Sequence, residues 1–361
     1  MTSTAQLPTL AHLPTLAHLP TLVQLRGALR AMPPHCDVST QLHELLRLGL
    51  DQLPLPGQGA TLQRWQALAL VAGHSLSLSK LYEGHTDALA LLAELGELDA
   101  AAADCDGASW GVWAAEGANA RVTITLGHDG AVWLDGTKCW CSGAQTLSHG
   151  LLTAWYADGR GPQLVRVAMH QPGVSVSCNA WHAVGMAASA SGEVTFSKAN
   201  AQLVGQPRDY ITRPGFWQGG AGIAACWYGG ARFLGEALHH TLSDLPPQAR
   251  GAFRLAALGK VDLALHSTAV VLQDAARWID SNPLFDARAT ALRTRLAAEH
   301  CAKQVLDEAG RALGAAAFCR DARFARTAAD LPVFVRQSHA DRDFTALAES
   351  TLLQGDNPWP L

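Results

Sequence analysis

Charged residues are scarce in this chain of 361 residues: they make up 16% of the sequence, against roughly 25% in an average soluble protein. No basic block is present, and the formal net charge is −4. Proteins that bind nucleic acid or anionic membrane surfaces need clustered lysine and arginine. The sequence therefore argues against nucleic acid and anionic membranes as partners. Its low fraction of charged residues predicts large buried interfaces between domains or subunits.

The sequence also lacks an uninterrupted apolar run of about 18 residues, so it predicts no membrane-spanning segment. It lacks a signal peptide as well, because the first basic residue is Arg26 and the segment before it is broken by Pro8, Pro14 and Pro20. The eight cysteines are scattered, without the spacing of a disulfide framework or a zinc site. We therefore expect a cytoplasmic protein without a bound metal.

Three near-copies of a hexapeptide, LPTLAH, LPTLAH and LPTLVQ, stand near the start of the chain, from Leu7 to Gln24. This period is too short for a solenoid, and we interpret residues 1–37 as a low-complexity leader. Hydrophobic residues make up 48% of the chain, which also carries 11 tryptophans. The bulk of the sequence can therefore bury a core and is not disordered.

Hydrophobic periodicity divides the rest of the chain into three domains. Residues 38–105 carry apolar side chains at three- and four-residue steps, which indicates helices. Residues 106–205 contain short β-branched runs separated by turn signals, which indicates a β-domain. Residues 206–361 return to helical stripes long enough for an antiparallel bundle. Within them, the Gly- and Ala-rich stretch 219–231 lacks the Lys-Ser/Thr of a phosphate loop and predicts close helix packing.

The most informative stretch is KCWCSG at residues 138–143, directly after the turn signal at Asp135-Gly136. In a β-strand, Trp140 and Ser142 would point to the same face. A flat indole beside a hydroxyl suits the isoalloxazine ring of a flavin, which needs a stacking wall and a donor near N5. An ordinary core tryptophan on a sheet explains the same residues, so this stretch by itself leaves both interpretations open.

Four motifs together resemble the acyl-CoA dehydrogenase superfamily: DGTKCWCSGA from Asp135, W-x-x-x-G-M ending at Met186, S-G-x-V-x-F ending at Phe196, and RDAR from Arg320. Their order and spacing follow the family over about residues 40–345. The resemblance implies an α+β fold with an N-terminal helical domain, a central β-barrel or β-sandwich domain and a C-terminal antiparallel four-helix bundle. It also implies FAD lying across the interface of a homodimer, with two dimers commonly forming a tetramer.

The activity that the resemblance implies is oxidation of an acyl-CoA thioester, in which a carboxylate takes the α-proton while flavin N5 takes the β-hydride. Its partners would be an acyl-CoA or related small molecule and an electron-transfer flavoprotein or flavin reductase. By the resemblance, the cofactor contacts are Trp140, Ser142, Glu116 and Gly117. The substrate contacts are Thr212, Arg213 and Trp217. Glu116-Gly117 is the remnant of a loop that reads T-E-P-G-x-G-S-D in the family.

The catalytic base departs from the family. Ala329 and Thr212 occupy the two positions at which members carry the glutamate, and neither side chain can take a proton. Asp330 is the substitute that we assign as the base. Because proline disfavours helix at the residue before it, Leu331-Pro332 predicts a loop that aims Asp330 inward. A carboxylate at a helix end or on the surface is the alternative. The family's R-x-x-F-G segment, whose arginine meets the FAD pyrophosphate, has no clear match, and Arg250 and Arg254 are the candidates to replace this arginine.

Three functions follow from this pattern. The first is FAD-dependent dehydrogenation of an acyl-CoA with Asp330 as base. The second is a flavin-dependent monooxygenase on the same fold, which dispenses with the glutamate and needs a reductase partner. The third is a non-catalytic family member that serves as a binding or assembly subunit. A further conspicuous group, Glu83-Gly84-His85, is interpreted as a helix break with a capping glutamate.

Overall fold

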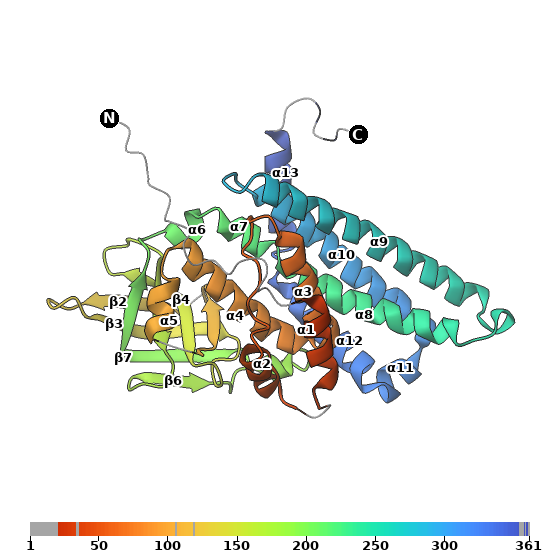
Figure 1. Ribbon diagram of the computed structural model, residues 1–361, viewed down its shortest axis with the longest axis horizontal. Helices are drawn as coiled ribbons and strands as arrows, with labels where there is room; N and C mark the ends of the chain where they lie inside the picture. The colour runs from red at the N-terminus through yellow and green to blue at the C-terminus, as the bar shows by residue number, and fades with distance from the viewer. Residues whose placement is uncertain are drawn as a thin grey trace.

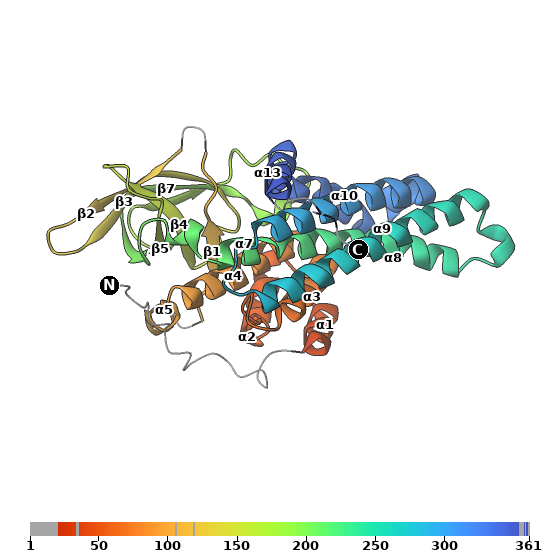
Figure 2. The same ribbon diagram turned by 90° about the horizontal axis from the view of Figure 1, so that it is seen from above.

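The computed structural model describes residues 21–33, 36–104, 107–117, 120–353, 357 and 359. In this part of the chain, helices come first, strands follow and helices return. The sheet lies at one end of an elongated molecule and the long C-terminal helices at the other, with α3 and α4 between them (Figures 1 and 2). This order of elements is the α+β arrangement that the periodicity predicts.

The helices before the sheet are α1 (Leu22–Ala31), α2 (Val38–Arg47), α3 (Thr61–His74), α4 (Leu76–Glu94) and α5 (Leu98–Asp104). Helix α1 starts with a capping box, in which the Thr21 hydroxyl accepts from the Gln24 N–H and the Gln24 side chain accepts from the Thr21 N–H. This helix lies within residues 1–37, which the sequence predicts to be a leader; residues 1–20 lie outside the described residues. Helix α4 also runs unbroken through Glu83-Gly84-His85, so the expected break there is wrong.

The strands are β1 (Trp110–Trp113), β2 (Val122–Leu126), β3 (Val132–Cys141), β4 (His149–Tyr156), β5 (Gln163–Ala168), β6 (Val174–Ser177) and β7 (Gly192–Val204). Pairing in the order β4-β2-β3-β7-β5 and back to β4 closes a five-stranded barrel. Strand β1 adds in parallel to β4, and β6 adds antiparallel to β7. Strand β2 shows why these residues form strands: Val122 and Ile124 face the core while Thr123 faces solvent.

After the sheet come α6 (Asp209–Thr212), α7 (Gly215–Gly220), α8 (Ile223–Ser243), α9 (Ala252–Ser281), α10 (Arg288–Leu313), α11 (Ala315–Arg320), α12 (Ala322–Phe334) and α13 (Asp341–Leu352). Helices α8, α9 and α10 pack side by side, and α3 lies against α8 (Figure 1). A Cβ atom on Gly229 would stand 2.3 Å from the carbonyl oxygen of Ala69. The close helix packing predicted for residues 219–231 is therefore confirmed at the α3–α8 contact.

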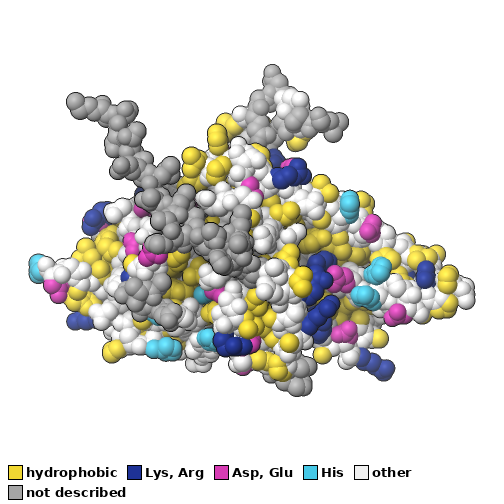
Figure 3. Space-filling view, viewed as in Figure 1, with side chains coloured by type: hydrophobic (Ala, Val, Ile, Leu, Met, Phe, Trp, Pro, Cys, Tyr) yellow, Lys and Arg dark blue, Asp and Glu magenta, His cyan; other side chains and the backbone are white. Residues whose placement is uncertain are grey.

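Helix α9 is long and apolar enough to cross a membrane by length and composition, and 22% of its apolar window is buried. Its exposed side chains include Phe253, Leu263 and Val270, which are 93%, 66% and 49% exposed. One such helix is weak evidence for a membrane span. Figure 3 shows other hydrophobic side chains on the molecular surface between the charged residues. Polar side chains such as Lys260 and His266 are exposed between the apolar side chains of α9, so these apolar side chains form separate exposed positions along the helix.

Candidate functional site

The end of strand β3 carries the tryptophan that the sequence analysis assigned to a flavin. The pairing of β3 with β7 shifts register between Lys138 and Cys141, and Trp140 within this bulge has a φ of +62°. The expected simple alternation of Trp140 and Ser142 along a strand does not hold, because the bulge re-aims one side chain relative to the other. Trp140 is 58% exposed, whereas Ser142, just past the strand, is 8% exposed.

Trp140 has one aromatic neighbour in a distant segment. The rings of Trp140 and Trp181 meet edge to face, with centroids 6.5 Å apart. Trp181 belongs to the W-x-x-x-G-M motif, which ends at Met186. Two motifs separated by 40 residues therefore meet at one exposed indole, whose free face offers a flat apolar surface.

A chain of hydroxyl groups runs from Ser142 into the same loop. Ser142 Oγ lies 2.6 Å from Ser191 Oγ, and Ser191 Oγ lies 3.0 Å from Ser189 Oγ. Ser189 Oγ donates to the carbonyl oxygen of Met186 at 2.8 Å, and its own carbonyl oxygen accepts from the N–H of Gly143 at 2.9 Å. These bonds fix the loop against the end of β3.

Asp330 anchors the other side of this loop. Its Oδ1 accepts a hydrogen bond of 2.6 Å from the Met186 N–H, and the residue is 1% exposed. Burial raises the pKa of the Asp330 carboxyl above its ordinary value, although the bond from the Met186 N–H acts in the opposite direction. The carboxylate thus binds the backbone of the loop.

The loop expected around Asp330 is not present, because α12 continues through Pro332 to Phe334. A proline inside a helix removes one hydrogen bond and costs about 3 kcal/mol. Packing offsets this cost here, since Leu331 and Phe334 on either side of Pro332 are 1% and 2% exposed. Asp330 is therefore held on the buried face of a continuous helix.

Gly185 brings the loop into direct contact with α12. A Cβ atom at this position would stand 1.9 Å from the Ala329 carbonyl oxygen and 2.9 Å from Val333 Cγ2. Only glycine allows the two backbones to approach this closely. The glycine of the W-x-x-x-G-M motif is thus explained by packing.

Glu116 and Gly117 lie beside the strand that leads to Trp140. Glu116 Oε1 lies 2.8 Å from Lys138 Nζ and also accepts from Thr153 Oγ1 at 2.8 Å. The Lys138 side chain is fully buried, whereas that of Glu116 is 37% exposed. A Cβ atom on Gly117 would stand 3.2 Å from Cys139 Sγ. Glu116 therefore serves as the counter-charge of a buried lysine on β3.

The predicted substrate contacts lie on α6 and α7. The Thr212 hydroxyl donates to the Arg208 carbonyl oxygen at 3.1 Å. Arg213 is paired with Glu94 of α4, with Nη1 and Oε2 2.5 Å apart. Trp217 is half-buried, with the Arg288 guanidinium 6.0 Å from its ring centroid. Among the described residues, no hydrogen bond, ion pair or ring contact joins this group to Trp140, Ser142 or Asp330.

No family model and no curated protein sequence matches this chain. Solved structures do. They include dibenzothiophene monooxygenase TdsC from Paenibacillus sp. A11-2 in complex with FMN and indole, at a TM-score of 0.75 and 20% identity over 93% of this chain and 95% of that one. A nitrososynthase from Micromonospora carbonacea var. africana matches at 0.76 and 17% identity over 93% and 95%. All these neighbours have the fold of acyl-CoA dehydrogenases. The chain has the acyl-CoA dehydrogenase fold.

A third similar structure, methanesulfinate monooxygenase MsuC from Pseudomonas fluorescens, covers 95% of this chain and 99% of its own, at a TM-score of 0.72 and 17% identity. The predicted resemblance to acyl-CoA dehydrogenases is therefore confirmed at the level of fold. Within the described residues, no group of three or more His, Cys, Asp or Glu side chains could hold a metal ion.

Proposed function

We propose that the protein is a flavin-dependent monooxygenase that oxidises a small molecule with O2. The observation that carries this choice is Asp330: it is 1% exposed and accepts the Met186 N–H. Dehydrogenation of an acyl-CoA requires a carboxylate that reaches the substrate α-carbon. Ala329 and Thr212 supply none, which makes acyl-CoA dehydrogenation and Asp330 as its base the less supported hypothesis. The similar structures named as monooxygenases support the same choice.

The residues at the end of β3 fit a flavin ring. Trp140 offers an indole face that is 58% exposed, and Trp181 holds this indole edge-on. Ser142 donates to Ser191 and Ser191 donates to Ser189, because the one proton of Ser189 goes to the Met186 carbonyl oxygen. In this proposal Trp140 stacks on the isoalloxazine ring and orients it, and the Ser142 hydroxyl turns from Ser191 to donate a hydrogen bond to the edge of the ring. Failure of the purified protein to take up added FMN or FAD would favour the alternative of a non-catalytic binding or assembly subunit.

The flavin, when bound, supplies the two electrons that activate O2. One oxygen atom enters the substrate and the other leaves as water, so a separate flavin reductase must deliver the electrons. The isoalloxazine ring is common to FAD, which the resemblance implied, and to FMN, which is bound in the TdsC structure. FMN is favoured, because this chain has no match to the arginine segment that meets the FAD pyrophosphate.

The test is a comparison of two reactions of the purified protein loaded with FMN or FAD. Reduced flavin in the presence of the protein and a small aromatic or sulfur-containing substrate is expected to consume O2 and yield oxygenated product. Anaerobic addition of a panel of acyl-CoAs is expected to leave the oxidised flavin spectrum unchanged. Bleaching by an acyl-CoA would overturn the proposed reaction in favour of dehydrogenation.

Trp140→Ala is expected to weaken flavin binding about tenfold, because stacking on an aromatic side chain contributes about 1–3 kcal/mol. Flavin fluorescence titration measures the loss. Trp359→Ala is the matched control, since Trp359 is 79% exposed in the C-terminal segment, and it should bind flavin as the unchanged protein does. Equal affinity in both variants would remove Trp140 from the site.

The exposed apolar side chains of α9 support a homo-oligomer. A second copy of the chain that covered Phe253, Leu263 and Val270 would remove these side chains from water, at about 25 cal/mol per Å2 of apolar surface. The intact protein is expected to have at least twice the mass of one chain by light scattering. Leu263→Glu should shift it toward the single chain. A single-chain mass for the unchanged protein would contradict this assembly.

A cytoplasmic location remains part of the proposal. The cysteines of the described residues are all free thiols: Cys36, Cys139, Cys141, Cys178, Cys226, Cys301 and Cys319. Free thiols of this number suit a reducing compartment. They also fit a protein that works beside a flavin reductase.

A further inference from the structure

A cavity of about 760 Å3 lies among the N-terminal helices, away from the end of β3. It is enclosed by α2, α4, α5 and the segment from Gly49 to Ala60. Small-molecule sites typically have volumes of about 300–1,000 Å3 and largely apolar walls. The apolar wall residues include Leu46, Leu53, Leu89, Ala90, Leu92 and Trp110. Trp140, Ser142 and Asp330 do not line this cavity, so it is separate from the proposed flavin site.

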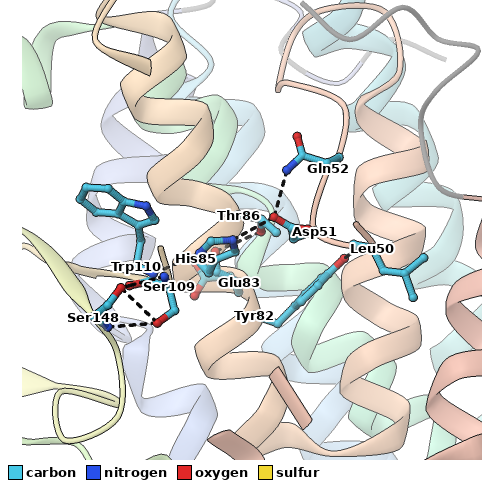
Figure 4. Close-up of polar contacts among 10 residues, drawn as sticks. All are labelled: Leu50, Asp51, Gln52, Tyr82, Glu83, His85, Thr86, Ser109, Trp110 and Ser148. Carbon is cyan, nitrogen blue, oxygen red and sulfur yellow. Dashed lines mark hydrogen bonds and ion pairs between the residues drawn. The ribbon is translucent and has the colours of Figure 1, made fainter. Parts of the chain in front are cut away.

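A histidine–aspartate pair (Figure 4) belongs to the polar part of the wall, together with Gln52, Gln58 and Thr86. His85 Nε2 lies 3.1 Å from Asp51 Oδ2, and the Trp110 N–H donates to His85 Nδ1 at 3.1 Å. Because a backbone N–H can only donate, Nδ1 is the acceptor and the neutral ring carries its proton on Nε2. The imidazole therefore donates to Asp51. His85 is 1% exposed and Asp51 is 7% exposed.

Backbone contacts hold this pair from both sides. The Tyr82 hydroxyl donates to the carbonyl oxygen of Leu50 at 2.5 Å, directly before Asp51. On the other side, Ser109 and Ser148 exchange hydrogen bonds of 2.9 and 3.0 Å, which join the start of β1 to β4 (Figure 4). The carboxylate and imidazole are therefore fixed before any ligand arrives, which lowers the entropic cost of binding.

The second oxygen of the carboxylate is free to bind. Oδ2 of Asp51 accepts from His85 and from Gln52 Nε2, the latter at 3.0 Å. Within the described part of the chain, Oδ1 receives no hydrogen bond, and it is not among the fully buried polar atoms. Burying a charge on the wall of an apolar cavity costs stability unless something binds it. Oδ1 is thus an open acceptor on a residue that lines the cavity.

The charged side chains that line the cavity have both signs. Arg47 of α2 and Asp99 of α5 are among them, and the Arg47 guanidinium is already paired with Glu44. These charges give no net attraction for an anion or a cation. A neutral ligand therefore fits this cavity best.

We propose that this cavity binds a neutral, largely apolar small molecule that donates one hydroxyl or ring N–H hydrogen bond to Asp51 Oδ1. His85 holds the carboxylate in place and is a positioning residue. The site does not depend on the flavin function, because none of its residues belongs to the end of β3. It gives the chain a second binding site, at which a small molecule would contact α4 from the side facing α2 and α5.

The test uses the full chain and two probes that differ in one donor: 1-naphthol, and 1-methoxynaphthalene, which has the same rings without the hydroxyl proton. Calorimetric titration is expected to show at least tenfold tighter binding of 1-naphthol. Asp51→Asn should weaken 1-naphthol about tenfold while keeping an amide oxygen for His85. Leu89→Trp should fill the cavity and remove binding. Leu126→Trp, on an exposed barrel position, is the matched control and should bind as before.

Flavin affinity and O2 consumption are measured on the same variants. Both are expected to stay unchanged in Asp51→Asn and Leu89→Trp, which separates this site from the proposed flavin site. Equal affinity for the two probes, or unchanged 1-naphthol binding in Leu89→Trp, would overturn the proposal. Binding that occurs only after residues 1–20 are removed would also overturn it, because that segment would then be the occupant.

Discussion

Gly185→Ala is expected to lower the free energy of unfolding by about 3 kcal/mol, at the severe end of single substitutions. The added Cβ would stand 1.9 Å from the Ala329 carbonyl oxygen and 2.7 Å from its carbonyl carbon. These are backbone atoms of α12, which cannot turn aside as the end of a flexible side chain could. The loop would have to lift from the helix, and Ser189 and Ser191 would move with it. Urea unfolding measures the stability, and flavin titration should show weaker binding.

Gly259→Ala in α9 is the matched control. An added Cβ at Gly259 would meet no atom within 4 Å. Alanine in a helix interior is favoured over glycine by about 0.5–1 kcal/mol, so this variant should be slightly more stable. If Gly185→Ala unfolded within about 0.5 kcal/mol of the unchanged protein, close to the scatter of ordinary surface substitutions, the contact between loop and α12 would be looser than described.

Asp330→Ala is expected to cost about 3 kcal/mol, because it leaves the buried Met186 N–H without an acceptor and opens a small cavity. Asp330→Asn should be nearly neutral at pH 7. Its amide oxygen can still accept from the Met186 N–H, and it removes the cost of burying a charge. Urea unfolding of the two variants, measured in parallel, separates the contribution of the hydrogen bond to stability from that of the buried charge.

The titration of Asp330 predicts how the free energy of unfolding changes with pH. Burial raises the pKa of Asp330 in the folded state above its unfolded value of about 3.9. Between these two pKa values the folded state binds more protons, so the unchanged protein loses stability as pH rises through the interval and levels off above it. Asp330→Asn lacks this loss and should gain relative stability over the same interval. If Asp330→Asn folded normally but lost all catalytic turnover, Asp330 would again be the candidate for the catalytic base.

The overall fold was predictable because its motifs lie in a fixed order along the chain. The turn signal before Lys138 and the change from helical to strand periodicity near residue 107 correspond to strands that the structure contains. Helix α1 was also visible in principle, since Thr21 and Gln24 have the spacing of a capping box. The third repeat, LPTLVQ, extends into the start of α1, and the repeat pattern favoured the interpretation of this segment as a leader.

Tertiary contacts explain what the sequence did not reveal. The bulge at Trp140 depends on the register of β3 against β7, which no local pattern specifies. Helix α12 continues through Pro332 because its neighbours are buried, which overrides the local preference of proline. Asp51 and His85 are 34 residues apart and meet only when α4 packs beside the segment after α2. Residue pairs of this kind result from tertiary packing, so no fixed spacing along the sequence identifies them.

The closure of the barrel limits where another chain could pair with the sheet. Strands β4 and β7 each exchange one pairing partner for another along their length, so the sheet wraps onto itself. In the described sheet, the short strands β1 and β6, of four residues each, lie outside this ring. Long exposed edges invite strands from other molecules, and a closed ring denies them that template. Within the described sheet, only the four-residue strands β1 and β6 therefore offer a free edge to another chain.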